Sequence, residues 1–73
     1  MSDDRLAELG QRIREIRRTR GLTQQVLADR AGLDRAYVGQ VERGKANISV
    51  RNLFRIGDAL AVGAAAFFSQ PSQ

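Results

Sequence analysis

Four hydrogen-bonding or charged side chains near the middle of the chain carry the most useful chemistry: Gln24, Arg35, Arg43 and Lys45. None of them forms a nucleophile–base pair, so the chemistry that they offer is binding. An arginine guanidinium donates two parallel hydrogen bonds, and a lysine supplies a compact positive charge. These groups are suited to the phosphates and base edges of a nucleic acid, and they predict a partner of that kind.

The composition argues against an enzyme. There is no cysteine, which excludes disulfides and thiolate metal sites, and no histidine, which removes the usual general base and imidazole ligand. The sequence contains no cluster of the residue types that hold a metal ion or pair a nucleophile with a base. We therefore predict no catalytic residues, no metal ligands and no cofactor.

Size and charge indicate a small binding domain. Seventy-three residues with a net charge of +4 fit a single domain with an anionic partner, either nucleic acid or an anionic membrane surface. No apolar run approaches the roughly 20 residues that cross a bilayer. The stretch MSDDRLAELG at the start is acidic and lacks the apolar centre of a signal peptide. We expect a soluble protein in the cytoplasm.

A turn at Gly32 joins the two elements that would present these side chains. The stretch 24–43 contains two short apolar patterns, and the glycine between them tolerates the positive φ that a tight turn needs. Ala28 is small where the two helices would cross, so their backbones can come close. In a basic chain, this arrangement predicts a DNA-reading helix-turn-helix. The apolar residues of the two helices are Leu27, Ala28 and Ala31, then Leu33, Val38 and Val41.

Helices are also predicted on both sides of this pair. Apolar residues three and four apart form a helical stripe near the start of the chain, and Gly21 ends that helix. Thr23 is the expected N-cap of a helix over about 24–31, Asp34 of a helix that ends at Gly44, and Ser49 of a fourth helix. The first stripe consists of Leu6, Leu9, Ile13 and Ile16, and the fourth helix has Leu53, Ile56 and Leu60 on one face, widened by Phe54.

A final turn or short helix is expected after Gly63, over about 64–68, which gives five short helices. The predicted fold class is thus all-α, with one compact domain over residues 1–68. No repeat, low-complexity segment or internal linker interrupts it. Residues 69–73, which include Pro71, are expected to form a flexible C-terminal tail.

Three segments carry a family resemblance: RGLTQQVLA, AGLDRAYVGQVERG and NISVRNLFRIGDAL. With these motifs at this spacing, the chain resembles the lambda-repressor-like (XRE-type) helix-turn-helix proteins, such as the lambdoid phage repressors and Cro, from about Leu6 to Phe68. The NIS-x-x-NL segment and the small size most resemble the controller proteins of restriction–modification systems. The resemblance implies a five-helix domain whose third helix, about 35–42, enters the major groove of DNA.

Base-reading residues follow from this resemblance. Arg35 opens the third helix, where its planar fork would bond guanine O6 and N7; otherwise it is an ordinary solvated arginine. Ala36 would touch a thymine methyl group. Gln40, one turn on, would reach either an adenine or a phosphate. Gly39 keeps this face flat enough for DNA to approach closely.

Contacts with the DNA backbone are expected around the same helix. The Gln24 side chain and the first free N–H groups of the second helix would grip one phosphate together, beside Thr23. Arg43, Lys45 and Asn47 follow the recognition helix, where the family clamps the DNA backbone.

Glu42, Arg17 and Tyr37 are expected to have roles within the fold, or in the case of Tyr37 either there or on DNA. Glu42 is the one acid within this basic surface, and the family pairs a glutamate here with an arginine of the first helix. Arg17 matches that arginine, so the resemblance implies a structural ion pair between Arg17 and Glu42. Tyr37 either contacts the phosphate and sugar of DNA or packs against the neighbouring helix.

The apolar residues near the end of the chain bear on the oligomeric state. Phe67 and Phe68 either both cover the domain's own core, or one of them turns outward, because adjacent helical residues point about 100° apart. One recognition helix reads few base pairs, so small helix-turn-helix proteins usually bind as two-fold dimers. We expect a homodimer held by Phe67 or Phe68, with Val50, Leu60 and Val62 in the same interface.

These expectations combine into a homodimeric, sequence-specific transcription regulator. It would bind double-stranded operator DNA of pseudo-palindromic sequence, including its own promoter, and occlude or assist RNA polymerase there, as the controller protein of a restriction–modification system. An antitoxin or phage-type repressor is the alternative within DNA binding. A protein-interaction adaptor is the alternative outside it, although an adaptor would tolerate acids at positions 24, 35, 43 and 45. We expect a bacterial or phage-encoded, nucleoid-associated protein with no membrane contact and no small-molecule ligand.

Overall fold

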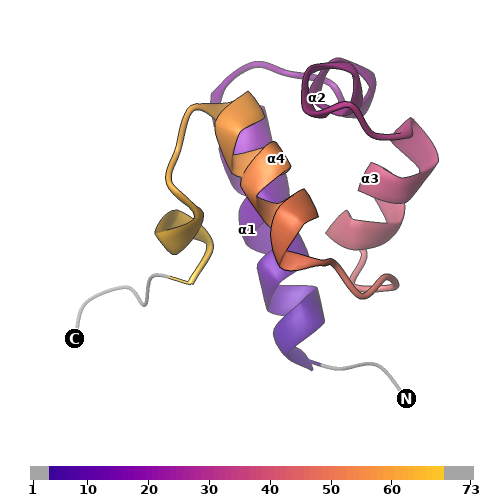
Figure 1. Ribbon diagram of the computed structural model, residues 1–73. Helices are drawn as coiled ribbons and strands as arrows, with labels where there is room; N and C mark the ends of the chain where they lie inside the picture. Colours follow the sequence, from indigo (N-terminus) through magenta and orange to yellow (C-terminus); the bar gives the residue numbers. More distant parts are fainter. Residues whose placement is uncertain (1–3, 69–73) are drawn as a thin grey trace.

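The computed structural model describes residues 4–68, and within that range the chain consists of helices, turns and loops, without strands. This range contains four α-helices and one short 3-10 helix, and Figure 1 shows the 3-10 helix near the C-terminal end of the chain. The elements are α1 (Asp4–Thr19), α2 (Gln24–Ala31), α3 (Arg35–Glu42), α4 (Val50–Leu60) and η1 (Ala64–Phe67). The all-α fold class is confirmed, whereas the tail expected at 69–73 lies outside the described residues.

The prediction of a fifth α-helix is wrong. Residues 64–67 form a single 3-10 turn, in which the Ala66 amide donates to the carbonyl oxygen of Gly63 over 3.0 Å. Such a short segment gains little from α-helical hydrogen bonds, and short connectors commonly adopt the tighter 3-10 pattern. The third helix has the bounds expected for the recognition helix of the family, 35–42, and Gly44, with a φ of 71°, follows two residues after its end.

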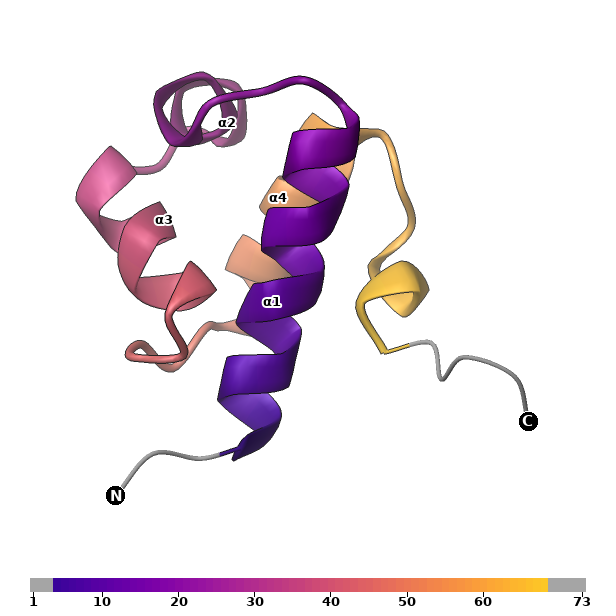
Figure 2. The ribbon, with the colours of Figure 1, turned by 180° about the vertical axis from the view of Figure 1, so that it is seen from behind.

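The shorter elements lie on opposite sides of the long helix α1. α3 packs against both α1 and α2, and α2 packs against α4. Figures 1 and 2 show the α2–α3 pair on one side of α1 and η1 on the other. The helix-turn-helix pair and the C-terminal turn therefore present separate surfaces.

A small apolar core joins the helices. The stripes predicted for α1 and α4 point into it, and Phe67 of η1 closes it with 1% of its surface exposed. Phe54, which was expected to widen the α4 stripe, is instead 55% exposed, because it points about 100° away from its neighbour Leu53. The buried apolar residues are Leu9, Ile13, Leu27, Ala28, Ala31, Val38, Val41, Leu53, Ile56, Leu60 and Phe67.

Short-range hydrogen bonds set the starts of the helices. The hydroxyl of Thr23 accepts from the Val26 amide over 3.1 Å, and the hydroxyl of Ser49 accepts from the Asn52 amide over 3.0 Å. Both N-caps are as predicted. Asp34 also occupies an N-cap position, but its carboxylate makes no capping hydrogen bond.

Two helices end in a residue of left-handed conformation. Gly32, in the turn between α2 and α3, has a φ of 70°, in agreement with the sequence-based expectation. Ala61 ends α4 with a φ of 60°, although its Cβ atom disfavours this conformation. The Ala61 amide donates to the carbonyl oxygen of Asp58 over 3.1 Å, so the helix end is satisfied despite the unfavourable backbone.

The C-terminal end of α3 approaches α1 at a glycine. A Cβ atom at Gly10 would lie against the carbonyl oxygen of Val41 and 2.7 Å from the carbonyl oxygen of Glu42. Real Cβ atoms essentially never come this close to another atom, so a side chain here would push the two helices apart. Gly10 therefore fixes the position of α3.

Gly10→Ala should lower the free energy of unfolding by about 1–3 kcal/mol, the usual cost of adding a group to a well-packed contact. Urea denaturation followed by circular dichroism measures it. Gly63→Ala is the control, because a Cβ atom there meets nothing within 4 Å and its φ of −72° suits alanine. A Gly10→Ala protein at least as stable as the control would show that this contact does not hold α1 and α3 together.

Candidate nucleic-acid interface

The first residues of α2 and α3 contact each other. Arg35 Nη1 donates a hydrogen bond to Gln24 Oε1 over 3.2 Å. Arg35 is exposed and Gln24 is half-buried. Thr23, just before α2, is exposed and already accepts the Val26 amide. The sequence predicted all three as DNA contacts, and the structure places them together at the start of the two helices.

The exposed face of α3 beside Arg35 carries a small and a polar side chain and is nearly flat. Ala36 and Gln40 are exposed, whereas Gly39 is buried. A Cβ atom at Gly39 would lie 3.3 Å from Arg43 Nη1 and 3.7 Å from Gln24 Oε1. Gly39 therefore leaves room for the Arg43 and Gln24 side chains to lie over α3. The base contacts of Ala36 and Gln40 stay predictions.

A buried ion pair lies behind this face. Arg17 donates twice to Glu42, from Nε to Oε2 over 2.7 Å and from Nη2 to Oε1 over 3.0 Å. Only 10% of the Arg17 side chain and 2% of the Glu42 side chain are exposed. Arg17 Nη1 also donates to the Leu22 carbonyl oxygen over 2.8 Å. The ion pair implied by the family resemblance is confirmed, and it joins α1 to α3.

Gln24 makes a further contact that the sequence did not predict. Its Nε2 donates to Glu42 Oε1 over 3.0 Å, so Gln24 lies between the ion pair and Arg35. A glutamine at the start of a helix is equally suited to hold a phosphate, and its type and position gave no signal for this second role.

Tyr37 packs against its neighbours within the domain. It is half-buried against the core, and its hydroxyl accepts a hydrogen bond from Asn52 Nδ2 over 3.2 Å. This contact joins α3 to α4 and corresponds to the packing alternative. The hydroxyl proton is still able to reach an acceptor, so a phosphate contact remains a prediction. Asn52 is a polar neighbour of this surface that the sequence analysis did not single out.

The loop after α3 carries exposed side chains on a fixed backbone. Arg43, Lys45 and Asn47 are exposed, and Gly44 between them is buried. A Cβ atom at Gly44 would lie 2.7 Å from the Cα atom of Ala7, and the φ of Gly44 is 71°. The loop is therefore held against α1, next to the end of α3.

The expected dimer interface is corrected at two residues. Leu60 and Phe67 are each 1% exposed, because they fill the domain's own core, and neither offers surface to a second chain. Val62 is half-buried against the same core. Val50 is 66% exposed and Phe68 is 59% exposed, so Phe68 is the outward-facing member of the phenylalanine pair.

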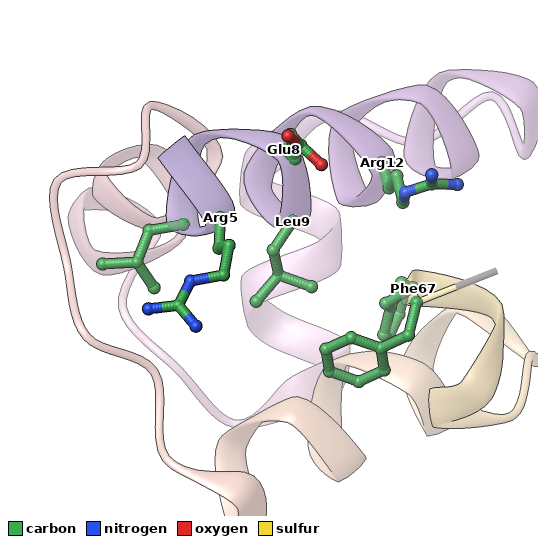
Figure 3. Close-up of a pocket in the computed structure, with 7 residues that line it drawn as sticks. Arg5, Glu8, Leu9, Arg12 and Phe67 are labelled. Atoms are coloured by element: carbon green, nitrogen blue, oxygen red, sulfur yellow. The ribbon is translucent and has the colours of Figure 1, made fainter. Parts of the chain in front are cut away.

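An apolar groove with a volume of about 400 Å³ lies beside Phe68, between the N-terminal half of α1 and η1. Figure 3 shows Leu9 of α1 directed across it towards Phe67, with the Arg5 side chain at its edge. The residues that line the groove belong to α1, η1 and Phe68 after η1. Figure 2 shows η1 on the side of α1 opposite to the α2–α3 pair. Its lining consists of Arg5, Leu6, Glu8, Leu9, Arg12, Phe67 and Phe68.

Residues 4–68 contain neither a metal-binding cluster nor a membrane-spanning helix. No group of three or more histidine, cysteine, aspartate or glutamate residues in that range is placed to hold a metal ion. No helix of the same range is long and apolar enough to cross a membrane.

Comparison with known proteins gives a family and several relatives. The helix-turn-helix family HTH_3 matches residues 13–67, a range that contains α2, α3, α4 and η1. Among solved structures, the restriction-modification controller protein C.AhdI from Aeromonas hydrophila is 46% identical. Its TM-score is 0.86, and the match covers 86% of this chain and 96% of C.AhdI.

Two examples illustrate the relatives that match by sequence. The immunity repressor protein of Bacillus phage phi105 is 39% identical over 62 residues, which are 85% of this chain and 43% of the repressor. The control protein C.BamHI of Bacillus amyloliquefaciens is 39% identical over 54 residues, 73% of this chain and 67% of C.BamHI. The chain thus spans less than half of the phage repressor's length and about two thirds of C.BamHI's.

Proposed function

We infer the function from the family, since this chain belongs to the helix-turn-helix family HTH_3 of transcription regulators. The proposed function is to read a specific DNA sequence with α3 in the major groove. The observation that carries this proposal is the exposed start of α3, where Arg35 lies against Gln24 beside the Arg43 side chain. The groups needed to contact bases and phosphates are therefore together on one side of the molecule.

The proposed base contacts come from Arg35, Ala36 and Gln40, which are all exposed on α3. An arginine at the start of a recognition helix is suited to guanine, whose O6 and N7 accept both prongs of its fork. Arg43 and Lys45 supply charge to the phosphates, and the proposed backbone contacts are completed by Thr23, Gln24, Tyr37 and Asn47.

The proposed biological role is that of a restriction–modification controller protein acting on its own operon in a bacterial cell, by occluding or assisting RNA polymerase. The likeness to C.AhdI and C.BamHI supports this role. A phage-type repressor is the second candidate, favoured by the likeness to the phi105 immunity repressor. A non-binding adaptor explains less well why the polar and basic side chains of α3 and its loop are exposed together.

A homodimer is the proposed form on DNA. A single α3 contacts few base pairs, and a two-fold dimer would place a second α3 about one helical turn away. The exposed Phe68 beside the groove suits such a dimer, because each copy would insert its Phe68 into the groove of the other. Burying one phenylalanine contributes about 1.5–3 kcal/mol per copy.

Arg35→Ala should cost about 1–3 kcal/mol on the preferred DNA site and much less on random DNA, because it removes a base contact. A site selected from randomised DNA and a random duplex of equal length are titrated at one salt concentration. Arg14→Ala, an exposed arginine of α1 outside the proposed interface, is the control. Equal losses on both duplexes would reassign Arg35 to the DNA backbone.

Arg43→Ala and Lys45→Ala should weaken binding to both duplexes about equally, since phosphates carry no sequence information. Each substitution should also reduce the salt slope of binding by about one unit, because one phosphate contact is lost. The slope is obtained from titrations at several salt concentrations. If it does not change, the substituted residue does not touch the DNA backbone.

Phe68→Glu should give a folded monomer with greatly weakened binding to the preferred site. Phe54→Glu tests the competing interface, because Phe54 is similarly exposed but lies on α4, on the same face as Val50, which was also expected in the interface. Sedimentation reports the oligomeric state, and circular dichroism reports the retained helices. If Phe54→Glu dissociates the dimer and Phe68→Glu does not, the interface lies on α4.

A further inference from the structure

We propose that the buried Glu42 positions Arg35 for base reading, acting through the amide of Gln24. The inference rests on the proposed function of Arg35, yet it concerns a residue that DNA cannot reach, since only 2% of the Glu42 side chain is exposed. An uninterrupted series of hydrogen bonds joins these residues: Arg17 and Gln24 both donate to Glu42, and Arg35 donates to Gln24.

The inner end of this chain of hydrogen bonds is rigid. Glu42 is held at both carboxylate oxygens by Arg17, and Arg17 is held in turn by the Leu22 carbonyl oxygen. Glu42 Oε1 therefore has a fixed place, where it accepts from Gln24 Nε2 over 3.0 Å as well as from Arg17 Nη2 over 3.0 Å.

The chemistry of Glu42 decides which way the Gln24 amide faces. An ionised carboxylate only accepts hydrogen bonds, so the amide must turn its NH₂ group towards Glu42. The carbonyl oxygen of Gln24 then faces Arg35, which only donates. With the amide reversed, two donors would meet and the 3.2 Å contact between Gln24 and Arg35 would be lost.

Holding Arg35 in the free protein has a consequence for binding. An exposed arginine has many rotamers, and immobilising such a side chain on binding weakens affinity by about two- to tenfold. Arg35 has already given up part of this freedom through its contact with Gln24. Glu42 thus favours sequence reading without touching the DNA, and it is a positioning residue.

The test compares Glu42→Gln, Gln24→Ala and Arg35→Ala, alone and in pairs. The readout is the ratio of affinities for the selected site and random DNA, which cancels any loss of folded protein. Glu42→Gln should lower the ratio by about two- to tenfold, because a glutamine there can donate and reverse the Gln24 amide. It should have no further effect in the Arg35→Ala background, where nothing remains to be positioned.

Ile56→Val is the control for stability, since it should destabilise the fold in the apolar core, at a residue that takes no part in these hydrogen bonds. Its affinity ratio should stay that of the original protein. If Glu42→Gln behaves like Ile56→Val, with an unchanged ratio, the proposal is overturned and Glu42 is only structural. Gln24→Ala keeps the proposal testable if Glu42→Gln does not fold: it too should lower the ratio only when Arg35 is present.

Side-chain relaxation measured by nuclear magnetic resonance tests the same point without DNA. The Arg35 guanidinium should be ordered in the original protein and more mobile in Glu42→Gln and Gln24→Ala. Equal mobility in all three would overturn the proposal. Should Arg35→Ala leave the affinity ratio unchanged while these mobilities differ, base reading by Arg35 would fail but its positioning by Glu42 would stand.

Discussion

The ion pair between Arg17 and Glu42 is the interaction on which the rest of the domain depends. Removing two charges from water is costly, and the cost is offset only when geometry and additional hydrogen bonds are good. Here Arg17 forms two bonds to the carboxylate and a third to the turn after α1. One buried pair thereby connects α1, the start of the helix-turn-helix and the end of α3.

Close backbone contacts complete what the ion pair begins. Among the described residues, Phe67 is the one aromatic side chain that is fully buried in the core. Because the other core side chains are smaller, close packing of the helix backbones contributes to stability together with the buried apolar area. Gly10 lets α3 approach α1, and Gly44 lets the following loop approach it too. The proposed DNA-binding surface therefore depends on α1 as well as on α2 and α3, because α1 supports both α3 and the loop that follows it.

Local patterns made much of the fold predictable. The turn at Gly32 and the caps at Thr23 and Ser49 depend on residues within a few positions of each other, and all three were predicted. The ion pair was available only through the family resemblance, because its partners are 25 positions apart.

What could not be predicted depends on tertiary placement. Phe67 and Phe68 are adjacent residues of the same type, with the same hydrophobicity and helix propensity. The sequence therefore could not show that Phe67 enters the core while Phe68 stays outside it. Phe54 was wrongly expected to pack against the core. The spacing of apolar residues shows which side of a helix faces the core, but not how wide the buried part of that side is. The contact of Gln24 with Glu42 also lies beyond local pattern, since it exists only once α2 and α3 have packed.

The left-handed Ala61 has a consequence for how such a regulator changes over generations. A residue with a Cβ atom in this conformation costs about 1–2 kcal/mol, a cost that glycine largely avoids. The turn after α4 is outside the recognition helix and its loop, so stability gained there leaves the reading surface intact. Natural domains sit only slightly above the stability that they need. A lineage that acquired glycine at this position would tolerate more destabilising changes in α3, and its sequence preference could evolve further before the domain ceased to fold.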